Sequence, residues 1–123
     1  VAAGLVAAAV LVAAAPKLAD LPQLRRDQAY QRALDADLER VIVAAGVREA
    51  VLACGRPYVG HLRGPWLAYR LDVEKRRVAF EPRPPGVVFR SRLRRDGPLE
   101  PTAEGFLTQV RGIHWTVLVK CTQ

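Results

Sequence analysis

The side chains of this chain that could do chemistry are two cysteines, two histidines and a group of arginines. Cys54 and Cys121 lie far apart, and together with the isolated His61 and His114 they do not form the ligand spacing of a zinc site. In an oxidising compartment the simplest interpretation is one Cys54–Cys121 disulfide. In the cytosol both residues would be buried thiols, so the choice depends on where the chain resides.

A run of arginines is the surface feature that stands out. Arg90 and Arg92 alternate in a predicted strand and would share one face of a sheet, followed by Arg94 and Arg95. Guanidinium groups arranged in this way can meet phosphate or carboxylate. A solvated strand face is the simpler alternative. We take Arg90, Arg92, Arg94 and Arg95 as a candidate anion-binding group.

No pattern in the sequence assigns a catalytic, metal-binding or cofactor-binding residue. His61 has the chemistry of a general base, but no serine or cysteine nucleophile lies near it along the chain. The glycines of segment 55–64 match neither the P-loop nor the dinucleotide fingerprint and are explained as turn residues. We therefore expect no cofactor and leave open whether the chain forms part of an enzyme.

The first 15 residues contain no charged or polar side chain, and Pro16 closes them. As a helix they would span about 22 Å, less than the roughly 30 Å of a hydrocarbon core. We interpret segment 1–16 as the end of a transmembrane helix whose earlier residues precede Val1. A secretory leader is the alternative, because Ala13-Ala14-Ala15 forms an A-x-A cleavage site, and a buried core helix is a third interpretation.

The rest of the chain is long enough for about one small domain. Its formal net charge is +7, and the basic residues are mostly arginine. Acidic residues are scattered among the basic ones and aromatic residues are few, so we expect no nucleic-acid partner. Anionic lipid headgroups are the natural counterpart of a basic domain beside a bilayer.

A long helix is the element with the clearest pattern. Asp20 before Pro22 is a helix start, and Gly46 is a stop. Between them, segment 24–45 carries one apolar stripe, formed by Leu34, Leu38, Val41, Ile42 and Ala45. The preceding residues are polar, so we divide the chain into an apolar segment 1–16, a polar stalk 17–31 and a folded domain 32–123.

The remaining elements are short. Segment 65–72 is predicted as a helix, with a strand as the alternative, while 55–65 and 94–105 are predicted as loops. Strands are predicted at 50–54, 77–80 and 86–93, and as a terminal hairpin of 106–111 and 115–121 around Gly112. The alternation of the last strand would point Cys121 inward, towards Cys54. The predicted fold is α+β, with an N-terminal membrane helix and one long amphipathic helix on a mostly antiparallel sheet of about five strands.

Five segments follow the apolar start in a recognisable order: LRRDQAYQRALDADLERVIVAAG, VLACGRP, GPWLAYRLDV, PGVVFRSR and HWTVLVKC. This order resembles the C-terminal extracytoplasmic part of polytopic membrane proteins from actinobacteria, some of them glycosyltransferases of the GT-C, mannosyltransferase-like type. In such enzymes the catalytic acidic residues lie near the first membrane helices, so the resemblance assigns no catalytic role to any residue here.

The resemblance implies a non-catalytic accessory domain of a larger integral membrane protein, on the extracytoplasmic side of the cell membrane. Its partners would be the membrane itself and an anionic lipid or a polyprenyl-phosphate sugar. Two alternatives remain open. The chain supplies part of a glycosyltransferase cleft, or it is a signal-anchored secreted binding module without enzymatic activity.

Overall fold

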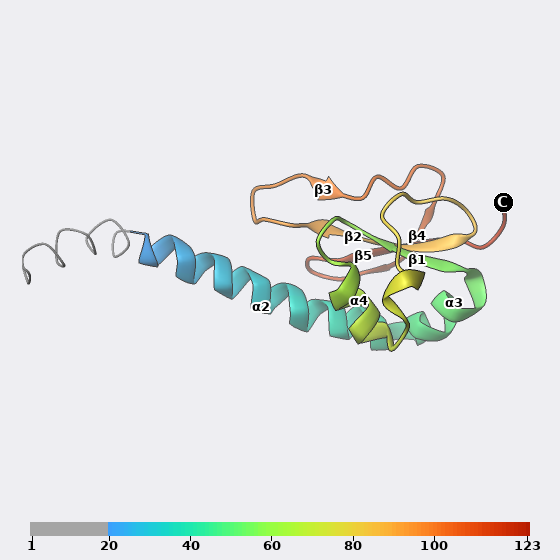
Figure 1. The fold of residues 1–123 in the computed structure, drawn as a ribbon, viewed down its shortest axis with the longest axis horizontal. Coiled ribbons are helices and arrows are strands. Elements are labelled where there is room, and N and C mark those ends of the chain that lie inside the picture. Colours follow the sequence, from blue (N-terminus) through green and yellow to red (C-terminus); the bar gives the residue numbers. More distant parts are fainter. Residues whose placement is uncertain (1–19) are drawn as a thin grey trace, which may run out of the picture.

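The computed structural model describes residues 20–123 (Figure 1). The predicted membrane helix at 1–16 and the start of the stalk at 17–19 lie outside the described residues. Within 20–123, none of the helices combines the length and the apolar character needed to cross a bilayer.

Helix α2 (Leu21–Val43) is the longest element, and its two halves differ. Residues 21–29 are all exposed, and this half extends beyond the rest of the domain (Figure 1). The second half buries an apolar stripe against the domain, which consists of Leu34, Leu38, Val41 and Ile42. Pro22 lies in the first turn as predicted, but the Asp20 carboxylate makes no capping hydrogen bond.

Helix α3 (Val47–Cys54) replaces the strand that we predicted at 50–54. A short 3-10 helix, η1 (Ala44–Gly46), ends at Gly46, whose φ of 69° turns the chain into α3. Val47, Val51 and Cys54 are buried at helical spacing. A continuous apolar run of five residues does not distinguish a helix from a strand, which is why the prediction was wrong.

Strand β1 (Arg56–Val59) lies within segment 55–65, which we predicted as a loop. It runs parallel to strand β2 (Gly86–Arg92), and its only other partner among the described residues is a single bridge to Ala79. Such an edge position tolerates Pro57, which has no N–H to donate. The strand predicted at 77–80 reduces to that bridge, because its first residue ends the 3-10 helix η2 (Lys75–Arg77).

The sheet has the order β1-β2-β5-β4. Strands β2, β5 (Thr116–Lys120) and β4 (Leu107–Arg111) are antiparallel neighbours, and β3 (Leu99–Glu100) pairs with β2 inside the predicted 94–105 loop. Helix α4 (Gly64–Leu71), strand β2 and the terminal hairpin confirm their predictions. The described chain is thus α+β, with five strands that are mostly antiparallel.

The sheet separates two groups of buried side chains. Helices α2, α3 and α4 cover one face (Figure 1), where the larger core includes Phe89, Trp115 and Val117. The opposite face carries a smaller cluster around Val88, which also includes Tyr58, Phe106 and Leu118. Alternate residues of β2 therefore point to opposite faces, as the sequence pattern predicts.

A disulfide joins Cys54 to Cys121, as predicted, with a Cα–Cα distance of 4.7 Å. It connects the end of α3 to the residue that follows β5. Cys54 is buried, whereas Cys121 is exposed although it is bonded to Cys54 as expected. The strand ends at Lys120, so the alternation of β5 no longer fixes the direction of residue 121.

Candidate anion-binding site

A row of three polar residues crosses the sheet at the end next to the β4–β5 turn. Thr116 of β5 stands opposite Arg90 of β2 on one side and opposite Arg111 of β4 on the other. Directly opposite residues on antiparallel strands share one face, and neighbouring strands are about 4.8 Å apart. Two arginines therefore flank one hydroxyl, on strands about 10 Å apart.

This row borders a cavity of about 340 Å³, which we call the basic cavity. Three arginines and one histidine line it: Arg90, Arg92, Arg111 and His114. Hydroxyl groups are contributed by Tyr30, Thr108 and Thr116. None of the residues that line the cavity is acidic, so its walls are electropositive.

Arg90 is only partly exposed, and its Nε is buried. Among the described residues, this Nε is the one buried side-chain polar atom that has no hydrogen-bond partner. Buried donors are nearly always paired, because an unpaired one loses its bonds to water without replacement. Arg90, which lines the basic cavity, thus retains an unused donor.

The Arg92 side of the cavity is fixed by helix α2 and by a turn. The Arg92 carbonyl accepts hydrogen bonds from the Tyr30 hydroxyl and from Arg63, both at 3.0 Å. The Arg92 guanidinium donates to the carbonyl of Gly97. The rings of Tyr30 and His114 meet edge-on, with centroids 5.4 Å apart. Burial raises the pKa of Tyr30, although the charges of two nearby arginines oppose this shift.

Asp37 positions the turn that carries His114. Its carboxylate is 2% exposed and accepts backbone N–H bonds from Ile113, His114 and Trp115 at 3.2, 2.7 and 3.0 Å. Burial alone would raise the pKa of Asp37, but these three bonds and nearby Arg40 outweigh it, so the pKa lies below its usual range. A buried carboxylate therefore fixes the β4–β5 turn at the edge of the cavity.

Arg63 supports β2 from the helical side of the sheet. It is 4% exposed, donates to the Ser91 hydroxyl at 2.8 Å, and lies 5.7 and 5.5 Å from the ring centroids of Trp66 and Trp115. Burial lowers its pKa, and the charges of Tyr30 and Glu100 oppose that shift. This arginine is a structural part of the core that sequence reasoning did not single out.

The structure divides the candidate group of four arginines. Arg90 and Arg92 line the basic cavity, whereas Arg94 and Arg95 are exposed in the turn after β2 and do not line it. Arg111 and His114 do line it, and sequence reasoning missed both. These two residues line the cavity because β5 lies between β2 and β4. No local sequence pattern predicts this order of strands.

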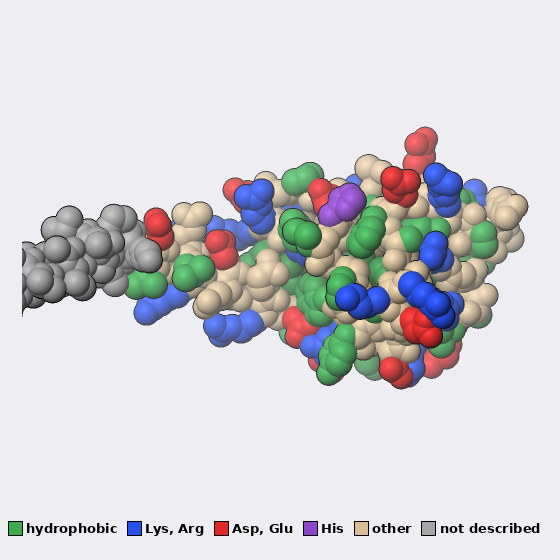
Figure 2. Space-filling model, viewed as in Figure 1, with side chains coloured by type: hydrophobic (Ala, Val, Ile, Leu, Met, Phe, Trp, Pro, Cys, Tyr) green, Lys and Arg blue, Asp and Glu red, His purple; other side chains and the backbone are tan. Residues whose placement is uncertain are grey.

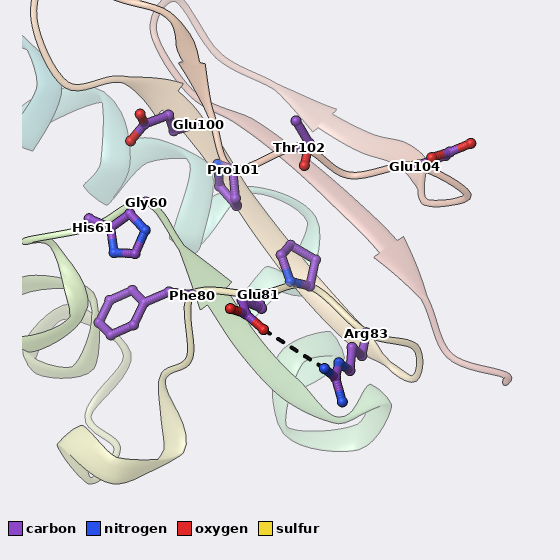
Figure 3. A pocket seen from close by; sticks show the side chains of 10 residues that line it. Gly60, His61, Phe80, Glu81, Arg83, Glu100, Pro101, Thr102 and Glu104 are labelled. Carbon is purple, nitrogen blue, oxygen red and sulfur yellow. Dashed lines mark ion pairs between the residues drawn. The ribbon is translucent and has the colours of Figure 1, made fainter.

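A second cavity, of about 540 Å³, lies near the loop after β1 (Figure 3). Its wall includes His61, whose ring stacks on Phe80 with centroids 5.4 Å apart, and a Glu81–Arg83 ion pair at 3.8 Å. No serine or cysteine of the described chain lines it, and Thr102 is its one hydroxyl-bearing residue. Within residues 20–123, no cluster of His, Cys, Asp or Glu side chains is placed to hold a metal ion.

The net charge does not form one continuous patch on the visible surface. On the face shown in Figure 2, lysine and arginine side chains are interspersed with aspartate and glutamate. The basic cavity is therefore distinguished by its lining residues and not by the overall charge. Comparisons with protein-family models, curated proteins and solved structures found no match for this chain.

Proposed function

We propose that this chain is a non-catalytic, membrane-tethered extracytoplasmic domain of a larger integral membrane protein. The observation that carries the proposal is the Cys54–Cys121 disulfide, which links residues 67 positions apart. Such bonds persist in oxidising compartments and are rare in the cytosol, where thiols are kept reduced. The apolar sequence of segment 1–15, which precedes α2, supports attachment to a bilayer.

The exposed half of α2 has the composition of a spacer. Residues 21–29 are all exposed, and five of them have charged or amide side chains: Gln23, Arg25, Arg26, Asp27 and Gln28. At 1.5 Å per residue, this part of the helix would hold the folded domain about 14 Å further from the bilayer. The polar stalk is thus a helix in its described part.

The partners that we propose are anionic: lipid headgroups or a polyprenyl-phosphate sugar. The basic cavity supports this, because it presents Arg90, Arg92 and Arg111 without an acidic lining residue. Together with the resemblance of the sequence, this favours an accessory domain that contacts the lipid-linked ligand of a glycosyltransferase whose catalytic residues lie elsewhere in the protein.

Binding to vesicles tests the proposed partner. The full chain should bind phosphatidylglycerol vesicles more tightly than phosphatidylcholine vesicles, because its cavity is basic. The paired substitution Arg90→Ala and Arg92→Ala should weaken this binding more than the matched pair Arg94→Ala and Arg95→Ala, which removes the same charge outside the cavity. Equal losses in the two pairs would mean that general charge attraction accounts for the binding.

Membrane attachment is tested separately in cells that produce the protein. The proposal predicts that the chain remains in the membrane fraction after a carbonate wash and that protease added outside the cytoplasmic membrane digests its folded domain. Recovery of a chain that begins directly after Ala15 in the soluble extracytoplasmic fraction would favour the secreted binding module instead.

A further inference from the structure

We propose that the basic cavity is a binding site for a single phosphate group, a monoester or diester, held between Arg90 and Arg111. The proposal deepens the function proposed above and rests on it only for the source of the phosphate. The chemistry of the site follows from the described residues alone.

Two features of the basic cavity favour a bound anion. The first is the repulsion between guanidinium groups, because Arg90 and Arg111 flank Thr116 in one row of adjacent strands and no lining residue neutralises them. The second is the buried Nε of Arg90, which has no partner. The nearest turn carboxylate, Asp37, is already engaged by three backbone N–H groups and does not line the cavity.

The donors around the cavity favour phosphate over a carboxylate. Arginine presents a planar set of donors that matches two oxygens of one phosphate, and two such groups can approach from opposite sides of Thr116. The hydroxyls of Thr116 and Thr108 add donors from the sheet itself. A tetrahedral phosphate offers oxygens in all these directions, whereas a carboxylate offers only two oxygens in one plane.

The cavity also has room for more than an isolated ion. Its volume of about 340 Å³ lies at the lower end of the range for small-molecule sites. Part of its lining is apolar, from Leu99, Leu118 and the exposed Ile113. These side chains can pack against the group to which the phosphate is esterified, so an organic phosphate should bind more tightly than inorganic phosphate.

The test uses the full chain in uncharged detergent micelles, with the arginine Nε–H signals followed by nitrogen-15 NMR. Inorganic phosphate is added at constant ionic strength, in exchange for chloride. We expect a saturable shift of the Arg90 Nε–H signal, because phosphate would bind the guanidinium group to which this N–H belongs. A shift that does not saturate, or one that chloride reproduces, would overturn the proposal.

Three single substitutions locate the site. Arg111→Gln should weaken phosphate binding about tenfold or more, since one charge-assisted hydrogen bond is worth about that factor. Thr116→Val should weaken it less, and Arg94→Gln should leave it unchanged. Arg111 is exposed, so its substitution is not expected to disturb the fold. If the Arg111→Gln variant nevertheless fails to fold, Thr116→Val still tests the proposal. Equal weakening by Arg94→Gln would refute the site.

Phosphatidylglycerol added to the micelles distinguishes the sources of phosphate. If this lipid shifts the same Arg90 signal and competes with inorganic phosphate, the site accepts a lipid diester and the proposed membrane partner is supported. If only inorganic phosphate shifts the signal, the phosphate site stands and the proposed lipid partner is contradicted. If neither ligand shifts it, the phosphate site itself is refuted.

Discussion

Replacing Asp37 with alanine should destabilise the domain strongly. The carboxylate is buried and accepts three backbone N–H groups of the β4–β5 turn, with the shortest bond, from His114, at 2.7 Å. A hydrogen bond to a charged group contributes about 1.5–3 kcal/mol, and such contributions within one network are not additive. We therefore expect a loss of about 3–5 kcal/mol in the free energy of unfolding, a large share of the stability of a small domain.

The assay is urea unfolding with the disulfide intact, followed by tryptophan fluorescence and circular dichroism. Asp27→Ala is the matched control, because Asp27 is an exposed aspartate in the first half of the same helix. The control should change the free energy of unfolding by less than about 0.5 kcal/mol. A loss below about 1 kcal/mol for Asp37→Ala would refute the conclusion that this carboxylate fixes the turn.

The pH dependence gives an independent check on Asp37. Because its pKa is lower in the folded protein than in the unfolded chain, the ionised carboxylate stabilises the fold above the unfolded pKa of about 4. This contribution disappears as the pH falls through the lower folded-state pKa. Asp37→Asn should therefore lose less stability than the wild type between neutral pH and acid, and an identical slope would contradict the assignment.

Three further variants should change stability by different mechanisms. Replacing Cys54 and Cys121 together with serine should cost about 4 kcal/mol in guanidinium unfolding, because the bond closes a loop across 67 positions. Gly112→Ala should cost about 1–3 kcal/mol, since its Cβ would lie 2.6 Å from Asp37 Oδ2, and an unchanged melting temperature would disprove this clash. Asp35→Asn should cost only about 1 kcal/mol by thermal unfolding, because its carboxylate is partly exposed although it binds an indole and a guanidinium.

The sequence predicts an element well where the pattern depends only on the residues of that element. The stripe from Leu34 to Ile42 predicts the packed half of α2, and the alternation of β2 places Arg90 and Arg92 on one face. Segment 50–54 was misassigned because a short apolar run suits a buried strand and a buried helix equally, and only Val47 completes the helical stripe.

The parts that could not be predicted depend on contacts between distant segments. Strand β1 is stabilised by pairing with β2 and by the bridge to Ala79. From the sequence alone, Pro57 favours the prediction of a loop in this segment. Likewise, Arg111 joins the basic cavity only because Thr116 stands between it and Arg90. The sequence contains these residues but not the order of strands that brings them together.

The state of the two cysteines in living cells tests the central claim most directly. Cells that produce the protein are quenched in acid, and a maleimide that adds mass is applied before and after reduction. The extracytoplasmic assignment predicts no tag on Cys54 or Cys121 before reduction and both tags afterwards. Two tags before reduction would show free thiols and would contradict the placement of this domain outside the cytoplasm.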